Sequence, residues 1–366
     1  MNATVEKPRV RFDFRTFSLM MLIAFVPMLA GTWWLFASYE DAYLDLTGKH
    51  LGDIAETAFH SVNGYLGNQI MVVAGLTEVP SLQEVVQTGN LDLKRDLEAV
   101  RKSIPKMETL WPTLSREAPQ AKAILDNPAS RFLRRYIETN KYYRDILVTD
   151  FFGRLVAATS KNTGYYFARE DWWKETYGDG LRGSVYISDT RYDPASKSYL
   201  MALAQPFVER DTGVVGVIKV VLNMQGIHAL IASMQAGPGT SVSLIHAKGD
   251  VISALGYTSL TQSAYPGTLD ILNAREKGRR YFLSTASTPT MYGLSQASFQ
   301  QIYPHLNWIV FTAGKVSDVI GPLPQLRKYL LFLLGGVFFC VIIATLIISR
   351  VESKPIIEED PHLEKL

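Results

Sequence analysis

Ile146-Leu-Val-Thr-Asp-Phe-Phe-Gly-Arg-Leu-Val156 is the stretch that decides the fold class, because it holds two apolar runs on either side of a tight turn. Residues 145–150 are rich in apolar and β-branched side chains and predict a short strand. Phe152-Gly153 supplies the turn, and residues 155–160 predict the returning strand. The stretch therefore predicts a β-hairpin and the start of an antiparallel sheet.

Further strand-like runs follow the hairpin. The first three are 185–188, 198–207 and 214–222, and Asp211-Thr212-Gly213 predicts a hairpin turn between the last two. A similar series then repeats at 242–246, 251–254, 280–284, 293–302 and 308–312, with Lys248-Gly249-Asp250 as a turn after its first strand. The sequence thus predicts two successive antiparallel-sheet modules, of which the second is smaller.

The region before the hairpin has a helical period. From Leu44 to Leu76, apolar residues recur at steps of three and four, close to the period of a coiled-coil seam. This pattern predicts a long stalk helix, whose seam packs on the chain's own domain, pairs with a second copy, or does both. Pro80 and Gly89-Asn90 predict the end of this helical phase. Residues 91–107 predict another amphipathic helix, interrupted by prolines, and 129–139 predict one more.

Two strongly apolar stretches, 17–37 and 329–348, bracket the rest of the chain, and each has roughly the 20 residues that a helix needs to span a bilayer. The basic residues that precede the first stretch and the acidic residues that follow it place the N-terminus in the cytoplasm. They are Lys7, Arg9, Arg11 and Arg15 before it, and Glu40, Asp41 and Asp45 after it. The alternative for this stretch is a cleaved signal peptide, but its length favours an uncleaved anchor.

The predicted layout is a two-pass protein of the bacterial inner (cytoplasmic) membrane. It has a cytoplasmic N-terminus (1–16), transmembrane helices at 17–38 and 328–349, a periplasmic region (39–327) and a cytoplasmic tail (350–366).

Composition excludes several classes of function. The chain has 366 residues and a net charge of +2, which gives no reason to expect a nucleic-acid partner. Cys340 is the only cysteine, so no disulfide forms within the chain. The exported histidines His60, His228, His246 and His305 lack metal-ligand spacing, and no cofactor motif, P-loop or Gly-x-Ser-x-Gly elbow is present. Asp189 and Asp193 form a candidate acid/base pair, but paired carboxylates on turns are common. We therefore predict no catalytic residue, metal or cofactor, and no enzyme activity.

Several motifs resemble, in their order and spacing, the double Cache (dCache) extracytoplasmic sensor domain of bacterial transmembrane receptors. They are the opening stretch 146–156, Asp171-Trp-Trp173, Tyr186-Ile-Ser-Asp-Thr-Arg-Tyr-Asp-Pro-Ala195, Ala204-Gln-Pro-Phe207 and Gly213-Val-Val-Gly-Val217. The resemblance implies an α+β fold with a long stalk helix and two PAS-like antiparallel-sheet modules. It implies stalk and helices at 39–125, a membrane-distal module at 126–235 and a membrane-proximal module at 236–327. It also implies a ligand pocket in the membrane-distal module and a homodimer.

The pocket residues that the resemblance implies differ from those of double Cache domains that bind amino acids. Tyr165 takes a Tyr position, and Trp172 and Trp173 take the positions of a Trp-Tyr pair. The Arg position falls on Glu170, with Arg169 one residue earlier. In the next motif Asp193 is kept while Arg191 replaces a Tyr, and the last Asp position falls on Val221. An ordinary α-amino acid is therefore not the ligand that these residues favour.

The same residues predict a site for a small polar molecule on physical grounds. Aromatic side chains offer flat apolar walls, and an arginine holds a carboxylate through two parallel hydrogen bonds. The predicted ligand-binding residues are Tyr165, Arg169, Trp172, Trp173, Tyr186, Arg191 and Asp193, with Tyr166, Glu170 and Asp189 nearby. The alternative is that the tryptophans fill a core and the charges lie on a solvated loop.

The segment after residue 348 is too short for a signalling enzyme. The sequence therefore predicts a sensor that passes its signal to a separate cytoplasmic or membrane signalling protein. Two alternatives remain open: the sensor part of a longer receptor, and a structural or assembly subunit of a membrane complex that binds no small ligand.

Overall fold

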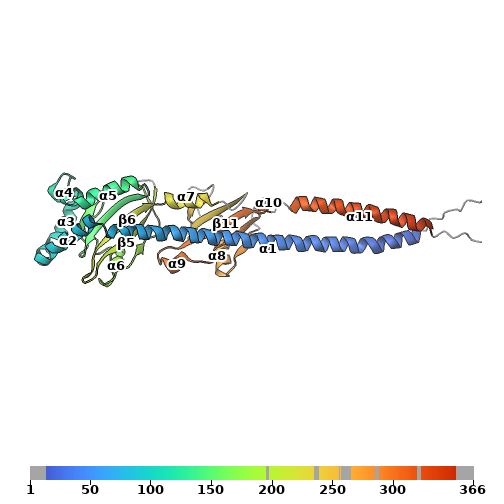
Figure 1. Ribbon diagram of the computed structural model, residues 1–366, viewed down its shortest axis with the longest axis horizontal. Coiled ribbons are helices and arrows are strands. Elements are labelled where there is room, and N and C mark those ends of the chain that lie inside the picture. Colours follow the sequence, from blue (N-terminus) through green and yellow to red (C-terminus); the bar gives the residue numbers. More distant parts are fainter. Residues whose placement is uncertain are drawn as a thin grey trace, which may run out of the picture. The chain divides into compact units, whose positions relative to one another are not determined.

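The computed structural model describes residues 14–194, 198–234, 239–254, 256, 265–284, 288–319 and 323–351 (Figure 1). The chain divides into two compact units. The central unit is Gly48–Val316, and the terminal unit combines Met1–Thr47 with Ser317–Leu366. The predicted boundary between the two sheet modules, at residues 235 and 236, lies outside the described residues, as do most of residues 1–16 and of the tail.

The terminal unit contains two long apolar helices. Helix α1 (Phe14–Thr77) begins in this unit, and α11 (Leu323–Val351) follows the short helix α10 (Val316–Val319). The most apolar 18-residue window has a mean hydropathy of 1.9 in Phe17–Thr77 and of 2.9 in Lys328–Ile347. By length and composition, both helices are therefore able to cross a membrane.

The central unit contains the rest of α1 and two antiparallel sheets. The first sheet has the order β2-β1-β6-β5-β3, with β4 also paired to β5, and the second has the order β8-β7-β11-β10-β9. The strands of the first sheet are β1 (Tyr143–Asp150), β2 (Leu155–Ala158), β3 (Tyr186–Ile187), β4 (Arg191–Asp193), β5 (Ser198–Glu209) and β6 (Gly213–Asn223). Those of the second are β7 (Thr240–His246), β8 (Val251–Ser253), β9 (Tyr281–Ser284), β10 (Thr290–Leu294) and β11 (Trp308–Lys315).

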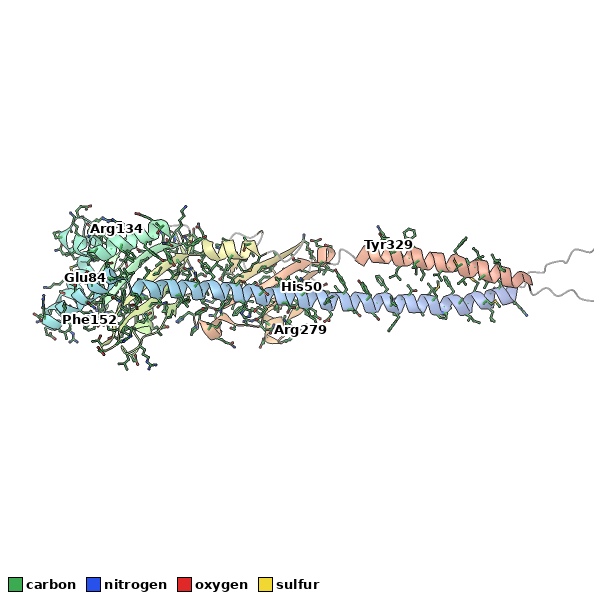
Figure 2. All side chains as sticks on the ribbon, in the orientation of Figure 1. His50, Glu84, Arg134, Phe152, Arg279 and Tyr329 are labelled. Carbon is green, nitrogen blue, oxygen red and sulfur yellow. The ribbon has the colours of Figure 1, made fainter. Side chains whose placement is uncertain are left out.

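Helices surround these sheets. They are α2 (Pro80–Arg95), α3 (Leu97–Leu110), the 3₁₀ turn η1 (Trp111–Thr113), α4 (Pro119–Leu125), α5 (Pro128–Thr139), α6 (Asp171–Tyr177), α7 (Gln225–Ser233), α8 (Thr268–Glu276) and α9 (Phe299–Ile302). We call the first sheet with α2 to α6 the first module, and the second sheet with α8 and α9 the second module. Figure 2 shows Glu84 and Phe152 in the part of the central unit that the first module forms, and Arg279 in the part that the second module forms.

The opening hairpin forms as its sequence predicts. β1 and β2 pair antiparallel, with Leu147 opposite Ala158. Asp150 organises the turn, because its Oδ1 accepts hydrogen bonds from the backbone N–H groups of Phe152 and Arg154. The Arg154 Nε lies 2.7 Å from the Asp150 Oδ2. Burial raises the pKa of the Asp150 carboxyl, while the Arg154 charge and these hydrogen bonds lower it.

The predicted seam of α1 packs on the chain's own sheets. Val62, Leu66 and Val73 are fully buried in one hydrophobic core that also contains residues of both sheets. Figure 1 shows α1 passing β6 and then β11. Hydrogen bonds add to this packing: the Tyr143 hydroxyl donates to Gln69 Oε1 at 2.6 Å, and the Thr312 hydroxyl donates to the Leu51 carbonyl at 2.9 Å. One helix therefore joins both modules.

Two predicted boundaries are wrong. Helix α2 continues through Gly89-Asn90, where the sequence predicts an end. Gly89 is needed there for close packing, because a Cβ would lie 2.9 Å from a Val156 methyl group. Asn90 lies inside the helix because its side chain donates to the Val215 carbonyl and accepts from the Phe151 N–H. Both residues serve tertiary contacts that no local pattern reveals.

The second wrong boundary is the predicted strand 293–302. Strand β10 ends at Leu294, and Phe299–Ile302 forms α9 instead. Gly293 allows the close approach of α1, because a Cβ at this position would lie 2.2 Å from the Leu51 backbone. Phe299 is fully buried against Phe59 of α1, with ring centroids 4.4 Å apart. After β10 the chain therefore forms a short helix that buries the Phe299 ring and does not continue as a paired strand.

Candidate ligand-binding site

Helix α6 covers one face of the first sheet and brings two predicted site residues there. Trp173 is buried, donates its Nε1–H to the Thr149 hydroxyl at 3.0 Å and stacks on Tyr177 at 4.7 Å. These contacts make Trp173 a core residue. Trp172 is also buried and packs against Phe167 on one side. Its ring remains in contact with a charged group on the sheet.

That charged group is Lys219, which the sequence analysis missed. Its Nζ lies 4.3 Å from the centroid of the Trp172 ring, a cation–π distance. Lys219 stands on β6, the central strand of the sheet, opposite Leu147 of β1 and Ala204 of β5. Burial, together with a smaller effect of the Arg191 charge, lowers the pKa of the Lys219 ammonium from 10.5 to about 8. An ammonium on an apolar sheet face is an unusual group in a core.

Two carboxylates have the opposite effect on the pKa of the Lys219 ammonium. Glu170 and Asp145 both raise the pKa of its ammonium. Asp145 is already occupied, because its Oδ1 accepts from the Ile146 N–H and the Thr159 hydroxyl, and its Oδ2 accepts from the Ser160 hydroxyl at 2.9 Å. Glu170 is exposed at the start of α6. Within the described residues, no hydrogen bond or ion pair to the Lys219 Nζ is found.

Strand β4 brings two further predicted residues to the first sheet. Arg191 and Asp193 pair with Leu200 and Ser198 of β5, and Arg191 is exposed. The Arg191 charge lowers the pKa of the Lys219 ammonium. Trp172 thus contacts Lys219, and the Arg191 charge acts on the same ammonium.

Three predicted residues lie in other places. Arg169 is exposed, 3.5 Å from a carboxylate oxygen of Glu108. Tyr186 packs on the His305 ring of the second module at 4.9 Å. Tyr165 packs on Trp111 at 5.9 Å, and burial raises the pKa of its hydroxyl. The predicted seven-residue site is thus spread over several surfaces of the first module.

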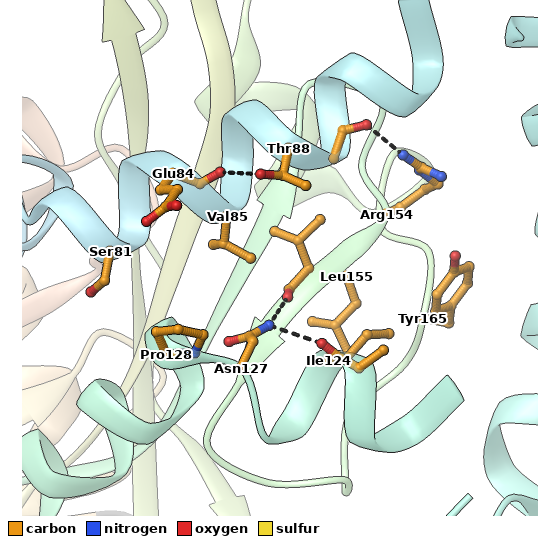
Figure 3. A pocket seen from close by; sticks show the side chains of 13 residues that line it. Ser81, Glu84, Val85, Thr88, Ile124, Asn127, Pro128, Arg154, Leu155 and Tyr165 are labelled. Atoms are coloured by element: carbon orange, nitrogen blue, oxygen red, sulfur yellow. Dashed lines mark hydrogen bonds between the residues drawn. The ribbon is translucent and has the colours of Figure 1, made fainter. Parts of the chain in front are cut away.

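Tyr165 borders a cavity of about 430 Å³ between α2, the α4–α5 corner and β2 (Figure 3). Its walls carry both apolar and polar side chains, and two of the polar ones have hydrogen-bond partners. Asn127 donates to the carbonyls of Val156 and Ala123, and Arg154 donates to the Gly89 carbonyl at 2.9 Å. This cavity contains neither Trp172 nor Lys219, so it is separate from the group around Lys219.

Asp189 was predicted to lie near the ligand-binding residues. In the structure its side chain contacts the second module. Its Oδ1 accepts from the Trp308 Nε1–H at 2.8 Å, and its Oδ2 lies 2.7 Å from the His246 Nε2. The Lys248 N–H donates to the His246 Nδ1, so the imidazole carries its proton on Nε2 and donates it to Asp189. A second pair, Glu175 with His305 at 2.7 Å, joins the same two modules.

In the part of the chain that the structure describes, no group of three or more His, Cys, Asp or Glu side chains is arranged to hold a metal ion. The chemistry of the group around Lys219 is instead that of non-covalent recognition. Two cationic side chains and an aromatic ring lie on a sheet face, and such groups bind small anions.

Comparison with known proteins identifies the fold. No family model and no curated protein matches the chain. Solved structures do match: the ligand-binding domain of the Campylobacter jejuni chemoreceptor Tlp3 in complex with 4-methylisoleucine has a TM-score of 0.51 at 11% identity, covering 77% of this chain and 95% of that one. The Tlp3 sensory domain with isoleucine bound has a TM-score of 0.50 at 12% identity, covering 76% and 96%. The fold is the double Cache fold. The predicted fold class is confirmed.

Proposed function

We propose that this protein is a membrane-anchored extracytoplasmic ligand sensor that binds one small polar metabolite in its first module. The observation that carries the proposal is the group formed by Lys219, Trp172 and Arg191, on a fold shared with chemoreceptor sensory domains. A partly buried ammonium with a lowered pKa is costly for stability and useful for binding.

The proposed topology follows the charge pattern. The helices at 17–38 and 328–349 cross the inner membrane, and residues 39–327 lie in the periplasm. The first module is then the membrane-distal one. Helix α1 packs on both sheets and continues into the first span, so it is the proposed route for the signal. A separate signalling protein reads it, and the protein acts as a homodimer without enzyme activity of its own.

The test is a binding screen on the full-length protein in lipid nanodiscs. Isothermal calorimetry and thermal shift should detect one class of compound among amino acids, organic acids, amines and purines. Arg191→Ala should weaken that binding about tenfold or more, because a charge-assisted contact is lost. Binding by none of these classes would favour the structural-subunit function instead.

A further inference from the structure

We propose that the site selects organic acids that carry a carboxylate and no ammonium group, and that Lys219 determines this selectivity. The inference rests on the proposed sensor function and specifies its ligand class. It comes from a side chain that no sequence motif marks as part of a site.

The first step is the position of the Lys219 ammonium. Lys219 projects from the middle of the sheet, where its strand partners Leu147 and Ala204 are apolar. Its side chain extends over this floor until the Nζ meets the face of Trp172 at 4.3 Å. The ammonium is therefore held in place by packing, and it occupies the aromatic face on which a ligand ammonium would otherwise bind.

The second step is the charge around that ammonium. Arg191 carries the same positive charge as Lys219 and lowers the pKa of its ammonium. Of the two carboxylates that act on Lys219, Asp145 is satisfied by its own hydrogen bonds and Glu170 is exposed to solvent. A ligand carboxylate between Lys219 and Arg191 would satisfy both cations.

The third step is the exclusion of amines. In an α-amino acid the ammonium is attached next to the carboxylate, so binding the carboxylate here brings a third positive charge close to Lys219 and Arg191. Like charges at such short distances disfavour binding. An acid of the same carbon skeleton without the amine avoids this cost. The site should therefore distinguish an amino acid from its deaminated counterpart.

Proton linkage supports the same conclusion. The pKa of Lys219 is lowered to about 8 in the unliganded protein. A bound carboxylate favours the charged amine and raises this pKa, so binding takes up a proton when the pH is above 8. The affinity for an acid should consequently fall as the pH rises through this value.

The experiment compares three matched pairs on the full-length protein by calorimetry: acetate with glycine, succinate with L-aspartate, and 3-methylpentanoate with L-isoleucine. In at least one pair the acid should bind tenfold or more tightly than its amino acid. Amino acids that bind as well as the acids would overturn the inference. So would a lack of binding by all three acids, and binding of an amine or purine would then leave the sensor function standing.

Variants separate the role of Lys219 from a general effect on folding. Lys219→Met keeps an unbranched apolar chain against Trp172 and removes the charge. It should weaken acid binding about tenfold or more and abolish the pH dependence between pH 7 and 9.5. Lys122→Met removes an exposed charge on α4 and should change neither. A pH dependence that survives in Lys219→Met would refute the assigned role.

Discussion

Replacing Lys219 by Met should stabilise the folded protein while it impairs binding. Burial lowers the pKa of this ammonium from 10.5 to about 8. At about 1.4 kcal/mol per pKa unit, keeping Lys219 charged in the folded state costs about 3 kcal/mol. Met avoids this cost but loses the contact of the cation with Trp172, which is worth about 0.5 to 2 kcal/mol. The expected net gain in the free energy of unfolding is about 1 to 2.5 kcal/mol.

The pH dependence of this gain has a definite sign. Below pH 8 the amine is charged in both the folded and the unfolded chain, so the full cost is present at pH 7. Between about 8 and 10.5 the unfolded chain binds more protons than the folded one, so the free energy of unfolding of the unmodified protein rises with pH. The advantage of Lys219→Met should therefore shrink from pH 7 to pH 10.

Urea unfolding in nanodiscs, followed by tryptophan fluorescence, measures the difference. Lys122→Met is the matched control, because it removes an exposed lysine from the same module. A Lys219→Met protein that is no more stable than the unmodified protein at pH 7 would refute the assigned cost. An advantage that stays constant up to pH 10 would refute its attribution to the ammonium.

Three other predictions concern the rest of the molecule. Asp189→Asn should lower the free energy of unfolding by roughly 1.5 to 3 kcal/mol, because it weakens two charge-assisted hydrogen bonds to the second module. The control Asp211→Asn, in an exposed turn, should change this free energy by less than about 0.5 kcal/mol. Equal effects of the two variants in urea unfolding would contradict the prediction. Protease added to spheroplasts should digest residues 39–327 and spare the tail, and the reverse pattern would contradict the topology. Oxidative crosslinking of Cys340 in membranes should capture a second protein or a second copy, and only uncrosslinked monomer would argue against it.

The fold was predictable where local chemistry and burial agree. The opening hairpin follows from two apolar runs and a turn, and α1 follows from a period of apolar residues that the structure buries. The prediction failed where a residue acts through a distant contact. Gly89 reads as a helix end, yet it lies inside α2 because Val156 packs against it. Such contacts depend on the tertiary arrangement and leave no local signature.

The site was predictable only in part, for a related reason. Trp172 and Trp173 have similar sequence contexts, but one ring meets Lys219 and the other fills the core. A signal for Lys219 was present: residues 214–222 read Val-Val-Gly-Val-Ile-Lys-Val-Val-Leu, with one charge in an otherwise apolar run. In the structure Lys219 is only partly exposed, and its strand neighbours Ile218 and Val220 are fully buried. A lone lysine in such a strand therefore indicates either a buried partner or a ligand.

The position of Asp189 connects the site to the rest of the molecule. Asp189 lies between β3 and β4, two residues before Arg191, which is the first residue of β4. The Arg191 charge acts on Lys219, whereas both carboxylate oxygens of Asp189 are bound by side chains of β7 and β11. A ligand that displaces Arg191 would therefore also pull on Asp189, which is hydrogen-bonded to the second sheet. Because α1 also hydrogen-bonds to that sheet through Thr312, the second sheet is in contact with both Asp189 and the long helix.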